Sequence, residues 1–93
     1  MRYIEEVEDI FDISGRGCVI VPGIPYFFEL KIDIDSILEF HNPSGSKVSA
    51  RIIGFEMINR GKPMQHAPFS LDRTVKKGDI EKGAKMYLVN INV

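Results

Sequence analysis

The sequence contains a single cysteine and lacks the features that mark several functional classes of protein. With only Cys18 present, the chain can form neither an internal disulfide nor a zinc site built from several cysteines. No apolar run approaches the ~20 residues that a membrane helix needs. We therefore expect no membrane partner. No Gly-x-x-x-x-Gly-Lys-Ser/Thr phosphate loop occurs either, so we expect no GTP binding by this chain.

A strong charge of one sign is also absent. The formal net charge of -1 gives no overall attraction to phosphate, so binding of nucleic acid would need a local basic patch. The first four residues are followed at once by acidic ones, which does not fit the apolar core of a secretory signal. We therefore expect a cytoplasmic location.

The composition is that of an ordinary globular protein, with 44% hydrophobic and 27% charged residues. A chain of 93 residues can remove roughly two-thirds of its unfolded surface from water. No internal repeat, linker or low-complexity segment interrupts it. We expect one domain over residues 1–93, in which Cys18 acts as a small buried hydrophobic side chain.

Short apolar runs separated by turn residues predict an all-β fold. Residues 7–13 and 18–21 flank the turn Ser14-Gly15-Arg16-Gly17, whose glycines supply the positive φ values of a tight hairpin. Alternating polar and apolar residues predict strands over 3–13, 18–24, 30–34, 37–40, 47–58, 69–75 and 84–93. Six or seven such strands favour a small antiparallel β-barrel.

Several local features refine this prediction. The core candidates of the first strand are Tyr3, Val7, Ile13 and one of Ile10 or Phe11. A change of phase at Gly54 predicts a bulge in the long strand over 47–58. Glycine and proline predict a loop over 59–68. Residues 79–83 resemble one helical turn, which begins at Asp79 and ends at Gly83.

No catalytic constellation is visible. The chain has no recognisable serine–histidine–acid set and no cluster with metal-ligand spacing, so we expect no catalytic residue, no metal and no cofactor. Asp33 and Asp35 could begin a calcium or magnesium site, but such sites need more oxygen ligands, and solvated charges are favoured. A small enzyme that uses His41, His66 or this acidic pair is the remaining enzymatic alternative.

Three consecutive aromatic residues, Tyr26, Phe27 and Phe28, follow the second predicted strand. In an extended chain, neighbouring side chains point to opposite faces, so at least one ring covers a second small core or lies on the surface. One interpretation is a loop that closes the end of the barrel, and this is the favoured one. The other is a patch that contacts a partner.

Three sequence blocks resemble the second domain of elongation factor Tu and related translational GTPases: VEDIFDISGRGCVIVPG (7–23), KVSARIIGFEM (47–57) and LDRTVKKGDIEKGAKM (71–86). The first block is similar to the family's Val/Ile-Glu-Asp-Val-Phe and Ser-Gly-Arg-Gly hallmark. The second is similar to its Gly-Val-Glu-Met strand, and the third to its Arg-Gly and Ile-Glu-Arg-Gly segment. The resemblance implies a barrel of the translation-factor domain 2 type.

In that family the domain follows a GTPase domain and helps to bind aminoacyl-tRNA, whose terminal adenosine enters a surface pocket. By resemblance, the matching pocket positions here are Ile13, Gly15, Val19, Glu56 and Leu71. Apolar side chains and a bare glycine backbone suit a flat base. A carboxylate can accept a hydrogen bond from an exocyclic amine or a ribose hydroxyl.

The chain also departs from the family pattern. Asn59 stands where the family has an arginine, MQHAPFS (64–70) replaces a glycine-containing segment, and the aromatic triple replaces a charged turn. The GTPase domain is absent from this sequence. We therefore expect a non-enzymatic binding module that contacts a protein partner, translation-related or regulatory, through residues 26–28. Binding of a single-stranded RNA 3′ end of the tRNA CCA type is the alternative.

Overall fold

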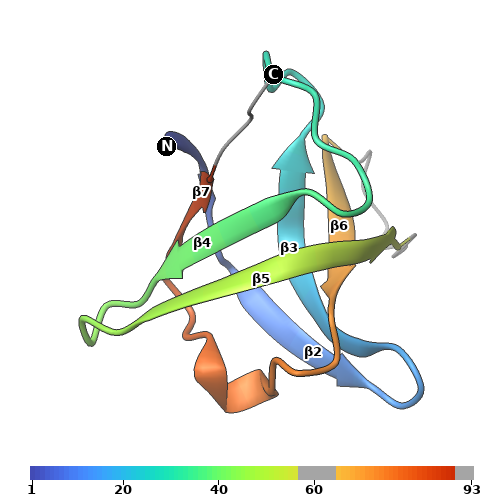
Figure 1. Ribbon diagram of the computed structural model, residues 1–93, viewed down its shortest axis with the longest axis vertical. Coiled ribbons are helices and arrows are strands. Elements are labelled where there is room, and N and C mark those ends of the chain that lie inside the picture. The colour runs from blue at the N-terminus through green and yellow to red at the C-terminus, as the bar shows by residue number, and fades with distance from the viewer. Residues whose placement is uncertain (57–64, 90–93) are drawn as a thin grey trace.

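The computed structural model describes residues 1–56 and 65–89 of the chain. In this part the fold is all-β, as predicted, and its seven antiparallel strands have the sheet order β1-β7-β4-β5-β6-β3-β2 (Figure 1). The elements are β1 (Arg2–Glu6), β2 (Asp9–Ile13), β3 (Gly17–Pro25), β4 (Ile37–His41), β5 (Lys47–Phe55), β6 (His66–Leu71), the 3₁₀ turn η1 (Lys77–Asp79) and β7 (Lys85–Leu88).

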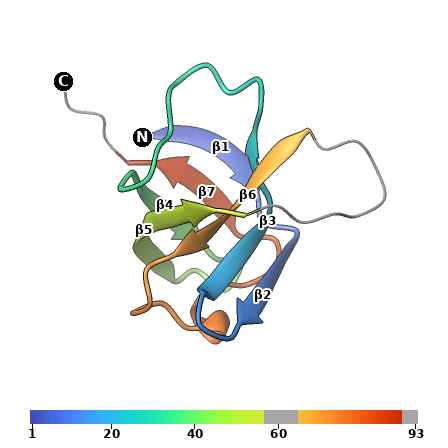
Figure 2. The ribbon, with the colours of Figure 1, turned by 90° about the vertical axis from the view of Figure 1, so that its right-hand side faces the viewer.

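β1 and β2 are consecutive in the chain and form the two opposite edges of the sheet, so the sheet curls round to bring these edges near each other (Figures 1 and 2). Only Val7 and Glu8 separate them. The N–H of Val7 donates to the carbonyl of Ala84, beside β7, whereas the N–H of Glu8 donates to the carbonyl of Val21 in β3. The expected single strand over 3–13 is therefore two strands, because the chain changes partner at this point. The result is barrel-like, although no β1–β2 ladder closes it.

The core is filled by apolar side chains from every strand, with Phe40 and Phe69 the largest that are fully buried. Val7 is buried as predicted, and Ile10 rather than Phe11 is the buried member of that pair. The assignment of Tyr3 to the core is wrong. Its side chain is 47% exposed and packs edge-to-face on the ring of Tyr87, its partner in the β1–β7 ladder. The neighbouring Ile4 is the buried residue of β1, so the alternation along the strand directs Tyr3 outward.

Residues 30–34 do not form the predicted strand. They belong to a loop over 26–36 that passes across one end of the barrel (Figure 1). Leu30 and Ile32 pack against the core from this loop, but Ile34 is exposed, and Asp35 adopts a left-handed φ of 78°. The alternation in the sequence therefore reflects a loop that rests on the core, without a partner strand.

The predicted bulge at Gly54 is confirmed, because the β5–β6 register shifts between Ile52 and Gly54. The predicted loop over 59–68 is wrong at its end, where β6 begins at His66; residues 57–64 lie outside the described part. Pro68 is tolerated inside β6 because it faces a register shift in β3, between Ile20 and Ile24, where a ladder N–H is not required.

The C-terminal elements are shorter than predicted. The strand expected over 69–75 ends at Leu71, because the carboxylate of Asp72 accepts the backbone N–H of Thr74 and forms a turn. The helical turn expected over 79–83 lies instead at Lys77–Asp79. The Asp79 side chain accepts the N–H of Lys76, so it reaches back across the turn and does not begin a new one. β7 ends at Leu88, and residues 90–93 of the last predicted strand lie outside the described part.

Candidate functional site

The outer surface of β2, β3, β6 and β5 carries Val19 and Glu56, two of the five positions that the resemblance assigns to the base pocket. In the ladders, Phe11 lies opposite Val19, Val19 opposite Ser70, and Ser70 opposite Gly54. Cys18 and Ile20 point into the core, so Val19 between them points to the outer surface. We call the row Phe11–Val19–Ser70–Gly54 the outer row.

Glu56 lies at one end of the outer row. Its backbone N–H donates to the carbonyl of Pro68 over 2.9 Å, which fixes the residue immediately after β5. Its side chain is only 11% exposed and forms an ion pair with the guanidinium of Arg16, from the β2–β3 hairpin turn. The hairpin and the end of β5, which are 40 residues apart in sequence, are joined by this contact.

The remaining predicted pocket positions lie in different surroundings. Ile13 has the outward phase of Phe11 and is half-buried, and Gly15 forms the hairpin turn with a φ of 81° and open space where a Cβ would project. Leu71 is fully buried in the core, opposite Ile52. The structure therefore brings Val19 and Glu56 to one surface, near the hairpin turn, and places Leu71 on the other side of the sheet.

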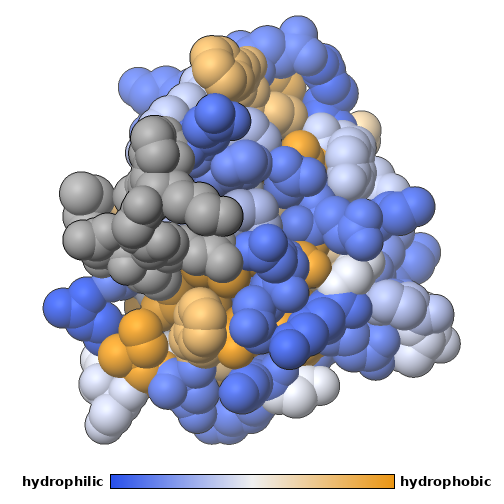
Figure 3. All heavy atoms as spheres, turned by 180° about the vertical axis from the view of Figure 1, so that it is seen from behind, coloured by the Kyte–Doolittle hydropathy of each residue, from blue (hydrophilic) through white to orange (hydrophobic). Residues whose placement is uncertain are grey.

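Ser70 is the residue of this surface that sequence reasoning missed. It is 3% exposed, and its hydroxyl donates to the carbonyl of Gly54 over 3.3 Å. The signal was present in the alternation along β6, because Phe69 and Leu71 are apolar and flank a polar residue. Seen from behind, the molecule shows apolar side chains gathered over β2 and β3 (Figure 3), which agrees with the exposure of Phe11, 41%.

The aromatic triple is divided between the core and the solvent. Phe28 packs against the core from the loop over 26–36, whereas Tyr26 and Phe27 are 59% and 83% exposed. The N–H of Tyr26 donates to the carbonyl of Gln65, and the N–H of Phe28 donates to that of Pro25, both over 3.0 Å. The two exposed rings therefore project from a backbone that is held on both sides.

The histidines do not converge on one site. Nε2 of His41 lies 2.6 Å from a carboxylate oxygen of Glu39, and Nε2 of His66 lies 2.8 Å from one of Glu5. These are separate pairs, on separate strands.

The acidic pair lies elsewhere again. Asp33 and Asp35 are exposed, 3.7 Å from Lys31 and Arg51 respectively. Among residues 1–56 and 65–89, no three His, Cys, Asp or Glu side chains are grouped as metal ligands.

Cys18 is enclosed at the inner surface of β3. The thiol is 2% exposed, and Sγ donates to the carbonyl of Val75 over 3.5 Å. Burial and the nearby carboxylate of Asp12 raise the pKa of the thiol. Because the thiolate is the nucleophile, this environment is that of an unreactive cysteine.

No protein-family model matches the chain, and a search of curated proteins finds no match either. The resemblance to elongation factor Tu therefore stays a prediction. Within the described residues, no helix has the length and apolar character needed to cross a membrane.

Proposed function

We propose that this protein is a non-enzymatic binding module that contacts a protein partner through the exposed rings of Tyr26 and Phe27. The observation that supports the proposal is the 83% exposure of Phe27 beside a second exposed ring, on a loop that Phe28 anchors to the core. Aromatic side chains are enriched at the energetic centres of protein interfaces. An anchored loop also loses little conformational freedom on binding, which favours affinity.

Charge favours the same kind of partner. A protein with a net charge of -1 does not attract the phosphates of a nucleic acid. Contact with a protein partner through aromatic rings does not depend on such electrostatic attraction. A translation-related or regulatory partner is what the resemblance implies.

The test compares a double variant, Tyr26→Ser with Phe27→Ser, with a matched control, Phe11→Ser, which removes an exposed ring from β2. Proteins that co-purify with the tagged chain are quantified for each variant. We expect the double variant to lose its specific partner at least tenfold, because removing interface aromatics typically costs 2 kcal/mol or more, roughly a factor of 30. Equal recovery by the double variant and the wild type would refute this surface.

A second candidate function is recognition of a single-stranded RNA 3′ end at the outer row, and it has an observation of its own. Glu56 is a nearly buried carboxylate at the end of an apolar surface, the arrangement that suits a base edge. Arg16 bonds one oxygen of this carboxylate, Oε1, so an amine of a base or a hydroxyl of a ribose has to donate to the other oxygen or displace Arg16. Val19 is also fully covered in the free protein, so binding at this site requires neighbouring side chains to move.

A proton–nitrogen correlation titration with a short RNA ending in cytidine-cytidine-adenosine tests this second candidate. Chemical-shift changes centred on Ile13, Gly15, Val19 and Glu56 are expected, and Glu56→Gln should weaken them. Asp33→Asn removes an exposed carboxylate elsewhere and serves as the control for charge. A flat titration, or equal binding by Glu56→Gln and wild type, would eliminate the RNA function and leave the protein-binding proposal standing.

A further inference from the structure

The loop over 26–36, which carries Tyr26 and Phe27, leaves the barrel beside its open seam. β2 pairs with β3 only from Gly17 to Val21, so residues 22–25 of β3 have no β2 residue opposite them. β1 contacts β3, although within residues 1–56 and 65–89 its backbone ladder is with β7 alone. In this part of the chain, the links between β1 and the loop are therefore made by side chains.

Glu5 makes the first of these links. The register of β1 shifts between Tyr3 and Glu5, so Glu5 lies opposite the buried Met86. A shift of this kind redirects a side chain. The two oxygens of the Glu5 carboxylate have separate partners. Oε1 accepts the backbone N–H of Glu6 over 3.0 Å, and Oε2 lies 2.8 Å from Nε2 of His66, at the start of β6.

His66 stands at the base of the loop. It is the ladder partner of Pro25, the last residue of β3. The residue before it, Gln65, accepts the N–H of Tyr26 through its backbone carbonyl over 3.0 Å. Glu5 therefore holds, through His66, the place at which the loop is bonded to β6.

Arg2 makes the second link, to the loop itself. Its guanidinium forms an ion pair with the carboxylate of Glu29, 27 residues away in the sequence. Both side chains are exposed, and an exposed pair alone contributes little to stability. Because both links start from β1, this strand holds the loop at its base and again three residues beyond Tyr26.

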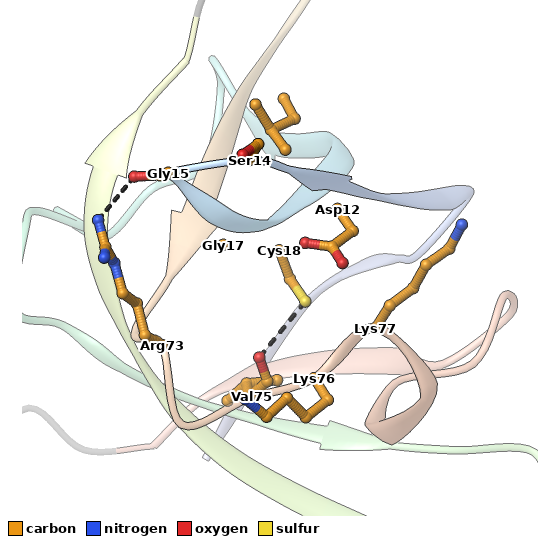
Figure 4. A pocket seen from close by; sticks show the side chains of 10 residues that line it. Asp12, Ser14, Gly15, Gly17, Cys18, Arg73, Val75, Lys76 and Lys77 are labelled. Carbon is orange, nitrogen blue, oxygen red and sulfur yellow. Dashed lines mark hydrogen bonds between the residues drawn. The ribbon is translucent and has the colours of Figure 1, made fainter.

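The opposite end of the barrel is held by contacts that involve no residue of β1. The loop over 26–36 and η1 lie at opposite ends of the molecule (Figures 1 and 2). Near η1, Nη2 of Arg73 donates to the carbonyl of Gly15 over 2.6 Å, and Sγ of Cys18 donates to that of Val75 over 3.5 Å (Figure 4). A change in the β1 links should therefore act at one end of the barrel.

We propose that β1 positions the protein-binding surface: Glu5, through His66, and Arg2, through Glu29, hold the loop over 26–36. The inference rests on the proposed protein-binding function, because that function gives the held loop its role. A loop that is held before binding loses less conformational entropy when a partner binds. Glu5 and Arg2 are positioning residues, which act on the surface from β1 and not by contact with the partner.

The test measures the exchange of backbone amides with solvent in the whole chain, by proton–nitrogen correlation spectra and with no partner present. Glu5→Ala should speed exchange at Tyr26 roughly three- to tenfold, because it removes a hydrogen bond to a charged group. Glu5→Gln keeps an oxygen that can accept the N–H of His66 and should restore most of the protection. The matched control is Glu39→Ala, which removes a half-buried carboxylate 2.6 Å from Nε2 of His41, both within β4. It should leave exchange at Tyr26 unchanged.

Glu29→Ala tests the second link. It should speed exchange at Tyr26 by no more than about fivefold, because its ion pair is exposed. The hydrogen-bonded amides of Arg16 and Val75, at the opposite end of the barrel, report on the rest of the fold. A positioning role predicts that these two amides exchange as in the wild type in every variant.

Unchanged exchange at Tyr26 in Glu5→Ala would overturn the proposal. So would equal acceleration at Tyr26, Arg16 and Val75, because a residue that only stabilises the fold acts on all three amides. No partner takes part in this measurement, so its result is independent of the co-purification test. The positioning role can fail while the double variant of Tyr26 and Phe27 still loses its partner, and the reverse outcome is equally distinguishable.

Discussion

Gly23 in β3 is the position at which a single methyl group should disturb the fold most. Its φ is +100°, and a Cβ built there would lie 2.0 Å from the carbonyl oxygen of Ala67 and 2.6 Å from Cα of Pro68. Both contacts are with the backbone of β6, so no side-chain rotation can relieve them. The substitution Gly23→Ala therefore forces β3 and β6 apart where their register already shifts.

The expected cost has two parts. A left-handed φ disfavours an L-residue by about 1–2 kcal/mol, and the steric overlap adds about 1–3 kcal/mol or more. Gly15→Ala is the matched control, because Gly15 also has a positive φ, of 81°, yet nothing lies within 4 Å of its Cβ position. The Gly15→Ala variant should therefore lose only the stability that the unfavourable backbone φ costs. Any effect of the added methyl group on the unfolded chain is common to both variants and cancels in the difference.

Urea unfolding followed by far-ultraviolet circular dichroism measures both losses, and it suits a chain without tryptophan. A domain of this size is stable by about 5–14 kcal/mol, so a loss of about 2–5 kcal/mol in Gly23→Ala removes a large share of it. We expect Gly15→Ala to lower the unfolding midpoint by about 1 M urea and Gly23→Ala by at least twice as much. Losses that agree within about 0.5 kcal/mol would refute the close approach of β3 and β6.

Two further predictions concern titratable groups. The hydroxyl and backbone N–H of Thr74 lower the pKa of Asp72 below its usual 3.8, so this carboxylate stabilises the folded state above about pH 4, and its contribution is lost as the pH falls through the lower folded pKa. Thr74→Ala should raise the pKa of Asp72 toward 3.8 in a carboxyl-carbon NMR titration, and an unchanged value would contradict the assigned hydrogen bonds. Cys18, with its raised pKa and 2% exposure, should react with iodoacetamide far more slowly in the folded protein than in urea. Equal rates would mean that the thiol is accessible.

The fold could be predicted from the sequence where the pattern and the physical cause coincide. β3 and β4 follow apolar runs closely, and the bulge at Gly54 appeared as a change in alternation. The segment over 30–34 shows the limit of this reasoning. Alternation reports which side chains are covered, and the loop over 26–36 covers Leu30 and Ile32 without any hydrogen-bonded neighbour. A strand needs covered side chains and also a neighbouring strand to hydrogen-bond with, and the sequence of one segment carries no information about that neighbour.

Proline shows the opposite case. The glycine and prolines of residues 59–68 predict a loop that ends at Pro68, although β6 runs from His66 to Leu71. The rule that proline cannot donate within a ladder still holds, because the register of β3 shifts between Ile20 and Ile24, opposite Pro68. The position of that shift depends on Gly23, whose lack of a side chain lets the two backbones approach. A long-range contact therefore decided the local structure.

The alternation of side chains along β6 shows why matching positions in a sequence block do not establish a pocket. The resemblance assigns Leu71 to the pocket, but the register of β6 directs Leu71 into the core and Ser70 to the outer row. A change of one residue in register exchanges the two surfaces of a strand. If a base does bind beside Glu56, it meets a hydroxyl already bonded to Gly54, and not an apolar wall. The outer row is therefore more polar than the sequence blocks imply, which weakens the RNA function relative to contact through Tyr26 and Phe27.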